Sequence, residues 1–168
     1  MRALVLCLLL TTFATAALAQ QAPAAATPPR VPTAAEALAA WQAFREDPLA
    51  RLDRTGPFLD FIRDSGEVHI VLNEDLLAWM YQPMDPNLKA TLYAAFLGGN
   101  MAEQLKNRQS GDGDDVAGMN SALDAYAAVK NAHPEFSLPL FESLGQARDE
   151  HRLAAAVKDI ESGAARKP

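Results

Sequence analysis

Three aspartates in one polar loop are the residues whose types and spacing best suit a ligand. Asp112, Asp114 and Asp115 lie in the Gly-Asp-rich stretch 109–115. Carboxylate oxygens suit calcium, but the twelfth position counted from Asp112 is Leu123, where an EF-hand loop needs Glu. We therefore expect this loop to be a surface that attracts a basic protein partner. The alternative is a solvated loop in which Asp115 caps the following helix.

The remaining polar residues do not form a recognisable catalytic set. His69, His133 and His151 are too far apart in sequence for two imidazoles to share one helix face, as a paired metal site requires. The sequence contains neither the H-E-x-x-H zinc motif nor the G-x-S-x-G nucleophile motif. No pair of carboxylates stands out for acid–base catalysis. We therefore expect a protein that is not an enzyme and that uses no metal and no cofactor.

Two glycines lie together inside the longest expected helix. Gly98 and Gly99 would each destabilise a helix interior by about 1 kcal/mol relative to alanine. Such residues allow another backbone or a large side chain to approach the helix closely. A neighbouring helix of the same domain is the favoured explanation, and a binding partner is the alternative.

The N-terminal residues predict export from the cytoplasm. Arg2 precedes an apolar run over residues 3–10, and residues 17–19 (Ala-Leu-Ala) match the small-x-small pattern that signal peptidase recognises. We expect residues 1–19 to be a cleaved signal peptide and the mature protein to be periplasmic or secreted. Cys7 is the only cysteine and lies inside this signal, so the mature chain would have no disulfide and no cysteine ligand.

The charge and hydropathy of the chain limit the kinds of partner that it can bind. The 168 residues carry a formal net charge of −6, whereas nucleic acids and anionic lipids attract basic surfaces. After the predicted signal, no apolar stretch reaches the roughly 20 residues that a membrane-spanning helix needs. We therefore expect the partner to be another protein, with no nucleic acid bound and no transmembrane segment in the mature chain.

Composition divides the mature chain into a tether, one domain and a tail. Residues 20–32 are rich in alanine and proline and predict a disordered tether. Residues 33–161 have apolar positions at helical spacing and predict an all-α domain, a compact bundle of about five to six helices. Residues 162–168 predict a disordered tail.

The helices of this domain are located by their caps and apolar faces. Thr33 and Glu36 have the spacing of a capping box at the start of the first helix. Residues 67–72 alternate like a strand but have no evident partner strand, so their structure stays open. The expected helices begin near Thr33, Pro57, Asn73, Asp85 and Val116, and a last helix runs unbroken from about 139 to 160.

A weak internal similarity raises the alternative of a repeat protein. Eight residues between Glu36 and Leu59 recur 38 positions later, between Glu74 and Leu97. A period in this range can mark helical-hairpin repeats. The competing explanation is chance similarity between helices rich in alanine and leucine. True repeats would favour a scaffold or assembly factor at the cell envelope.

Four short stretches of the chain match a known pattern of motifs. They are a Leu-Leu step at 76–77, an aromatic–aliphatic–x–Gly step within 93–98, a His-Pro-Glu sequence at 133–135, and the helix that begins near Phe141. Together they resemble small periplasmic immunity proteins, which protect bacteria from type VI secretion effectors with amidase activity. That family usually carries cysteines around its central helices, and this mature chain has none. The resemblance implies an inhibitor that blocks an enzyme's active site and performs no chemistry itself.

Overall fold

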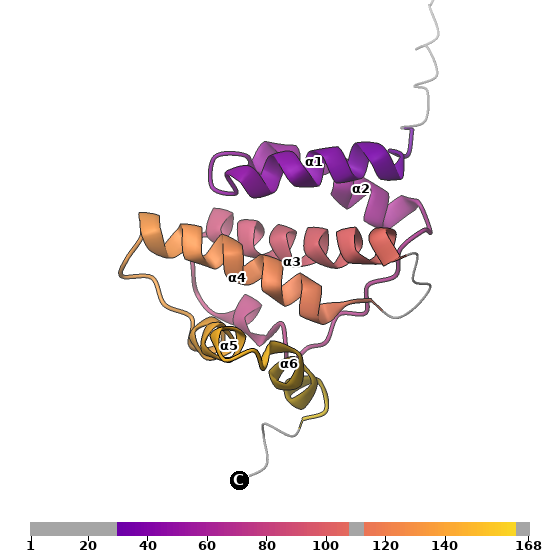
Figure 1. The fold of residues 1–168 in the computed structure, drawn as a ribbon. Coiled ribbons are helices and arrows are strands. Elements are labelled where there is room, and N and C mark those ends of the chain that lie inside the picture. Colours follow the sequence, from indigo (N-terminus) through magenta and orange to yellow (C-terminus); the bar gives the residue numbers. More distant parts are fainter. Residues whose placement is uncertain (1–29, 108–112, 164–168) are drawn as a thin grey trace, which may run out of the picture.

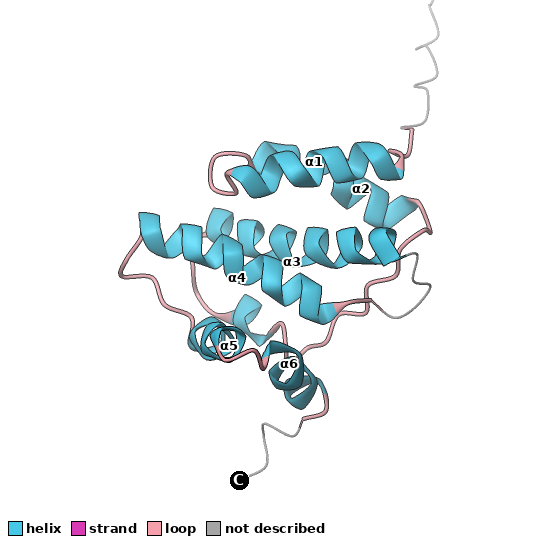
Figure 2. Cartoon of the chain, in the orientation of Figure 1, coloured by secondary structure: helices cyan, strands magenta, loops and turns pink. Residues whose placement is uncertain are grey.

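The computed structural model describes residues 30–107 and 113–163, and every regular element in these two ranges is a helix (Figure 2). The predicted all-α bundle of five to six helices is therefore confirmed. The expected signal peptide, most of the tether and most of the tail lie outside the described residues. The helices are α1 (Ala34–Glu46), α2 (Gly56–Asp64), α3 (Pro86–Asn107), α4 (Asp115–Ala132), α5 (Pro139–Asp149) and α6 (Leu153–Glu161), with two 3-10 helices, η1 (Leu52–Arg54) and η2 (Ala78–Tyr81).

The helices form three layers, with α3 and α4 in the middle (Figure 1). These two helices run antiparallel and share the most extensive interface in the domain. Helices α1 and α2 pack on α3 from one side, and α5 and α6 pack on α4 from the other. Their apolar faces meet in one continuous core, and each buried Phe or Leu in it contributes roughly 1.5–3 kcal/mol. The fully buried aromatic side chains are Phe44, Phe58, Phe61, Trp79, Phe96 and Phe141.

Helix α1 begins with the capping box that the sequence predicts. The amide of Glu36 donates to the Thr33 hydroxyl at 3.3 Å, and the amide of Thr33 donates to the Glu36 carboxylate at 2.8 Å. This backbone hydrogen bond, followed by one from the Arg30 side chain, lowers the pKa of Glu36 to about 2. The predicted start of this helix is therefore confirmed, and the helix ends at the C-cap Asp47.

The segment between α2 and α3 contains neither a strand nor the predicted continuous helix. Residues 67–73 form irregular structure, and no described residue pairs with them as a strand. Asn73 does accept hydrogen bonds from the amides of Asp75 and Leu76, as expected of a helix start. Only turns and the short η2 follow, and η2 ends at Gln82, which is extended because Pro83 comes directly after it.

The two copies of the 38-residue similarity fold differently. Residues 36–46 belong to α1, whereas the equivalent residues 74–84 form turns, η2 and irregular structure. Phe58 lies in the short helix α2, whereas its counterpart Phe96 lies in the middle of α3. The structure therefore favours chance similarity between alanine- and leucine-rich segments over a helical-hairpin repeat.

The predicted last helix is broken at residues 150–152, so the expectation of one unbroken helix was wrong. The amide of Arg152 donates to the carbonyl of Ala147, and the amide of His151 donates to that of Arg148. This pair of bonds is the Schellman motif that closes many helices, and it requires a left-handed residue after the C-cap. His151 takes that conformation, with φ of +59°. The sequence did not reveal the break because glycine is the usual residue at this position.

We expect His151→Gly to stabilise the domain by about 0.5–1 kcal/mol, because glycine adopts the left-handed conformation without the steric cost of a Cβ atom. In thermal unfolding followed by circular dichroism, the midpoint should rise by about 2–4 °C. His133→Gly is the matched control, since this C-cap of α4 has φ of −133° and gains nothing from glycine. A midpoint that rises equally in both variants, or in neither, would contradict strain at His151.

Candidate functional site

Gly98 and Gly99 lie buried inside the domain, where neighbouring helices explain both of them. A Cβ atom on Gly98 would lie 2.2 Å from Cε3 of Trp41. A Cβ atom on Gly99 would lie 2.2 Å from the Ser121 hydroxyl and 2.8 Å from the carbonyl oxygen of Ala117. The two glycines therefore let α1 and α4 approach α3 closely. They offer no exposed surface to a partner, so we do not include them in the candidate site.

The described aspartates of the acidic loop have different roles. Asp114 is the N-cap of α4, because its carboxylate accepts a hydrogen bond from the amide of Ala117 at 2.9 Å. The sequence assigned this cap to Asp115, which is instead the first residue of the helix. Its carboxylate accepts a hydrogen bond of 3.0 Å from the side chain of Asn100. Asp112 lies outside the described residues.

A buried pair of amides on α3 holds the surroundings of Asp115 together. Asn100 and Gln104 lie one helical turn apart, both buried, and their side chains are joined by a hydrogen bond of 2.6 Å. The side-chain oxygen of Gln104 also accepts a hydrogen bond from the main-chain amide of His69 at 3.0 Å, and its side-chain nitrogen donates one to the carbonyl oxygen of His69 at 2.8 Å. Asn100 accepts from the main-chain amide of Asp114 at 3.0 Å. These bonds attach the irregular segment 67–73 and the start of α4 to the same face of α3.

Sequence reasoning missed this pair, although a signal was present. Asn100 and Gln104 are polar residues at i and i+4 on the apolar face of a long helix, on either side of the buried Met101. Buried polar groups are almost always hydrogen-bonded, so such a pair predicts main-chain or side-chain partners from another segment. The sequence did not indicate that the partner segment would be 67–73.

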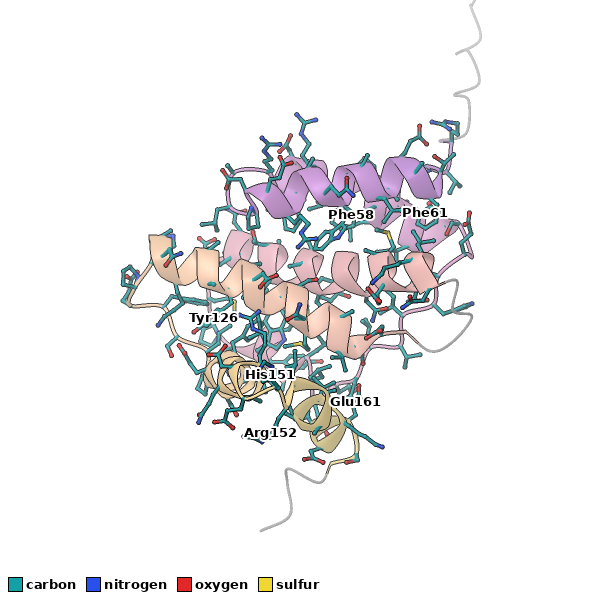
Figure 3. All side chains as sticks on the ribbon, viewed as in Figure 1. Phe58, Phe61, Tyr126, His151, Arg152 and Glu161 are labelled. Carbon is teal, nitrogen blue, oxygen red and sulfur yellow. The ribbon has the colours of Figure 1, made fainter. Side chains whose placement is uncertain are left out.

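Segment 67–73, the start of α4 and the end of α6 surround a hollow of about 490 Å³, which we call the acidic hollow. Two large apolar side chains on its rim, Val71 and Leu72, are 57% and 46% exposed. Figure 3 shows Glu161 on α6, on the same side of the domain as the start of α4. The residues that line the hollow are Val71, Leu72, Asn73, Glu74, Gly113, Asp115 and Glu161.

The charges of the acidic hollow are all negative. Glu74, Asp115 and Glu161 line it, and none of the described lining residues is basic. The pKa of Asp115 is raised to about 7, first because the carboxyl group is partly buried and then because the carboxyl groups of Glu161 and Asp114 lie near it. The hydrogen bond from Asn100 acts in the opposite direction. The hollow is therefore suited to a cationic group that neutralises these carboxylates.

The described residues do not group into a metal site. His69 lies on segment 67–73, His133 caps the end of α4, and His151 lies between α5 and α6 (Figure 3). Across residues 30–107 and 113–163, no three His, Cys, Asp or Glu side chains lie close enough together to hold a metal ion. Within the same ranges, no helix has both the length and the apolar character needed to cross a membrane.

Comparison of the chain with protein-family models, with curated proteins and with solved structures finds no match. The resemblance to immunity proteins therefore still depends only on the four short stretches of sequence that carry it.

Proposed function

We propose that this protein is a non-catalytic binding protein that holds another protein through the acidic hollow. The observation that carries the proposal is the position of the exposed Val71 and Leu72 beside the carboxylates of Asp115 and Glu161. Exposed apolar side chains rimmed by polar groups are typical of protein-binding surfaces. The bonds from Gln104 to His69 hold this apolar pair in place before a partner arrives, which reduces the entropy lost on binding.

The chemistry of the hollow suits a partner segment that carries a lysine or arginine next to an apolar residue. Glu74, Asp115 and Glu161 would attract the cation, and the net charge of −6 would accelerate the approach of a basic partner. Val71 and Leu72 would each contribute about 1 kcal/mol or more if the partner removed their exposed surface from water.

The predicted signal peptide would place this binding outside the cytoplasm, in the periplasm or in the medium. The resemblance suggests a concrete form of the proposal, in which the partner is a secreted amidase effector and the protein blocks its active site. The scaffold alternative depended on helical repeats, and the two similar segments fold differently. The immunity-type inhibitor is therefore the specific form that we propose.

Capture of partners by the wild-type chain and by two variants tests the proposal. Val71→Ser/Leu72→Ser removes the apolar pair, whereas Val31→Ser removes an exposed apolar side chain that does not line the hollow. A true partner is captured from periplasmic extract by the wild type and by the control but not by the double variant. With purified partner, the double variant should raise Kd by at least about tenfold, which corresponds to 1.4 kcal/mol. An unchanged Kd in a correctly folded double variant would reject the hollow as the binding site.

The inhibitor form has its own test. An effector captured in this way should lose its amidase activity when mixed with one equivalent of the wild-type chain and should keep it with the double variant. Full activity in the saturated complex would reject the inhibitor form while leaving the binding function intact.

A further inference from the structure

We propose that a second surface of this protein, at the start of α3, docks a protein segment that carries an aspartate or glutamate beside an apolar residue. The surface is a hollow of about 270 Å³, which we call the methionine hollow. Docking here would be independent of the acidic hollow and would select a segment of the opposite charge. The residues that line the methionine hollow are Met80, Met84, Pro86, Lys89, Ala90 and Tyr93.

Two neighbouring elements form the methionine hollow. Lys89 and Tyr93 lie one helical turn apart, on the face of α3 that begins with Pro86. Met80 belongs to η2, and Met84 lies in the segment that joins η2 to α3. Met80, Met84 and Tyr93 are partly buried and pack against the core. This packing holds the walls of the hollow in place before a partner arrives, which reduces the entropy lost on binding.

Lys89 carries the charge of this hollow, and its own helix offers no carboxylate to neutralise it. Asp85, one turn earlier, uses its side chain to cap α3 and accepts hydrogen bonds from the amides of Asn87 and Leu88 at 2.8 and 3.3 Å. One turn after Lys89, the helix has Tyr93 instead of an acidic residue. The ion pair that a lysine commonly forms with a residue one turn away on a helix is therefore not made.

Most other basic side chains of the domain are already paired within it. In the described ranges, each lysine and arginine forms an ion pair with Asp or Glu, except for Arg45, Lys89 and Lys158. Arg45 lies over the ring of Trp41, 6.0 Å from its centroid. Lys158 is exposed on α6. Lys89 is therefore the described cation that is unpaired, partly buried and surrounded by apolar side chains.

These features select the occupant. An incoming carboxylate would give Lys89 the ion pair that the domain does not provide, and the surrounding apolar side chains would strengthen that pair by excluding water. The hollow is smaller than the roughly 300–1,000 Å³ of most small-molecule sites, so it fits one or two side chains of a larger partner. Methionine side chains adapt their shape to different apolar groups. Tyr81, the residue after Met80, is 82% exposed and can extend the contact, since tyrosine is enriched in protein interfaces.

The methionine hollow and the acidic hollow can be occupied at the same time. Lys89 lies near the start of α3, whereas Asn100, which binds Asp115 of the acidic hollow, lies roughly 16 Å further along the helix axis. Helix α4 runs antiparallel to α3, so the start of α4 lies at the opposite end from Lys89 (Figure 1). The domain would therefore hold two partners of opposite charge, or two oppositely charged parts of one partner.

The experiment is an NMR titration of the full chain, labelled with ¹³C in its methionine methyl groups, with two matched peptides. The acidic probe is acetyl-Ala-Leu-Glu-Leu-Ala-amide, and the control probe has glutamine in place of glutamate. The methyl signals of Met80 and Met84 should shift with the acidic peptide, whereas those of the fully buried Met101 and Met119 should not. The control peptide should bind about threefold more weakly in low salt, as expected when an ion pair at a partly exposed site is lost.

Two lysine variants locate the charge that causes this preference. Lys89→Gln should bind the two peptides equally. Lys158→Gln, which removes the other lysine that is unpaired in the described ranges, should keep the threefold preference. Val71→Ser/Leu72→Ser should keep it too, because these residues line the acidic hollow and not the methionine hollow. A failure of the acidic hollow as a binding site would therefore leave this result unchanged.

Three results would overturn the proposal. The first is the absence of a shift at Met80 and Met84 at the highest soluble concentration of the acidic peptide. The second is equal binding of the two peptides to the wild-type chain, and the third is a preference that Lys89→Gln retains. The comparison of the two peptides on the wild-type chain needs no variant, so it decides the matter even if Lys89→Gln does not fold.

Discussion

Gly98→Ala is expected to destabilise the domain by about 1–3 kcal/mol, although alanine is the better helix former by about 1 kcal/mol. The new Cβ would lie 2.2–2.8 Å from three ring carbons of Trp41. That ring is buried between α1 and α3 and packs edge-on against Phe58, so it has little room to move. The clash therefore outweighs the gain in helix propensity, and α1 must shift away from α3.

Gly145→Ala is the matched control for this prediction. Gly145 also lies inside a helix, α5, but a Cβ there would meet only Leu123, at 4.0 Å, which is an ordinary contact. We expect this variant to gain about 0.5–1 kcal/mol. Urea unfolding of both variants measures the difference in the free energy of unfolding. If Gly98→Ala were as stable as Gly145→Ala, the tight approach of Trp41 to α3 would be wrong.

Gln104→Leu is expected to lower the free energy of unfolding by about 2–4 kcal/mol. Leucine fills a similar volume but leaves the amide and carbonyl of His69 without their present partner and removes one of the two donors to the side-chain oxygen of Asn100. An unsatisfied group of this kind costs about 1–3 kcal/mol, less where water can reach it. The irregular segment 67–73 should then separate from α3, which would also displace Val71 and Leu72 and weaken partner binding.

Two measurements check this prediction. Urea unfolding gives the loss of stability, and amide hydrogen exchange should show that protection is lost first at residues 67–73 while α3 and α4 keep theirs. Gln146→Leu is the control, since Gln146 is exposed on α5 and its side chain donates to the exposed Glu150, so its loss should change stability by less than about 0.5 kcal/mol. Equal stability of the two variants would show that the amide pair does not hold the segment.

The helices and their starts could be predicted from the sequence because the interactions that form them are local. The capping box of Thr33 and Glu36 joins residues three positions apart, and Asp85 accepts hydrogen bonds from amides two and three positions ahead. Apolar residues at helical spacing similarly indicate which face of each helix is buried. These features determined the all-α class and most of the helices, but not the absence of a regular α-helix after Asn73 or the division of the last helix into α5 and α6.

Predictions that depended on competition between neighbouring residues were less successful. Asp114 and Asp115 can each cap a helix, and in the folded chain Asp114 takes the cap while Asp115 accepts a hydrogen bond from Asn100 on α3. His151 adopts a conformation that sequence patterns associate with glycine. Burial of Leu153 and Val157 holds α6 against the core beyond this break, which is an effect of packing that no local preference encodes.

The sequence by itself determined that the chain forms helices, that Asp114 and Asp115 lie in the polar loop that leads into one of them, and that the overall charge suits a basic partner. Only the tertiary structure decided what surrounds these aspartates. Gln104 binds His69, 35 residues earlier in the chain, and Glu161 reaches Asp115 from the last helix. The physical reason is that such contacts arise when separate helices bury their apolar faces against α3 and α4, so the partners of a polar side chain follow from the packing of the core.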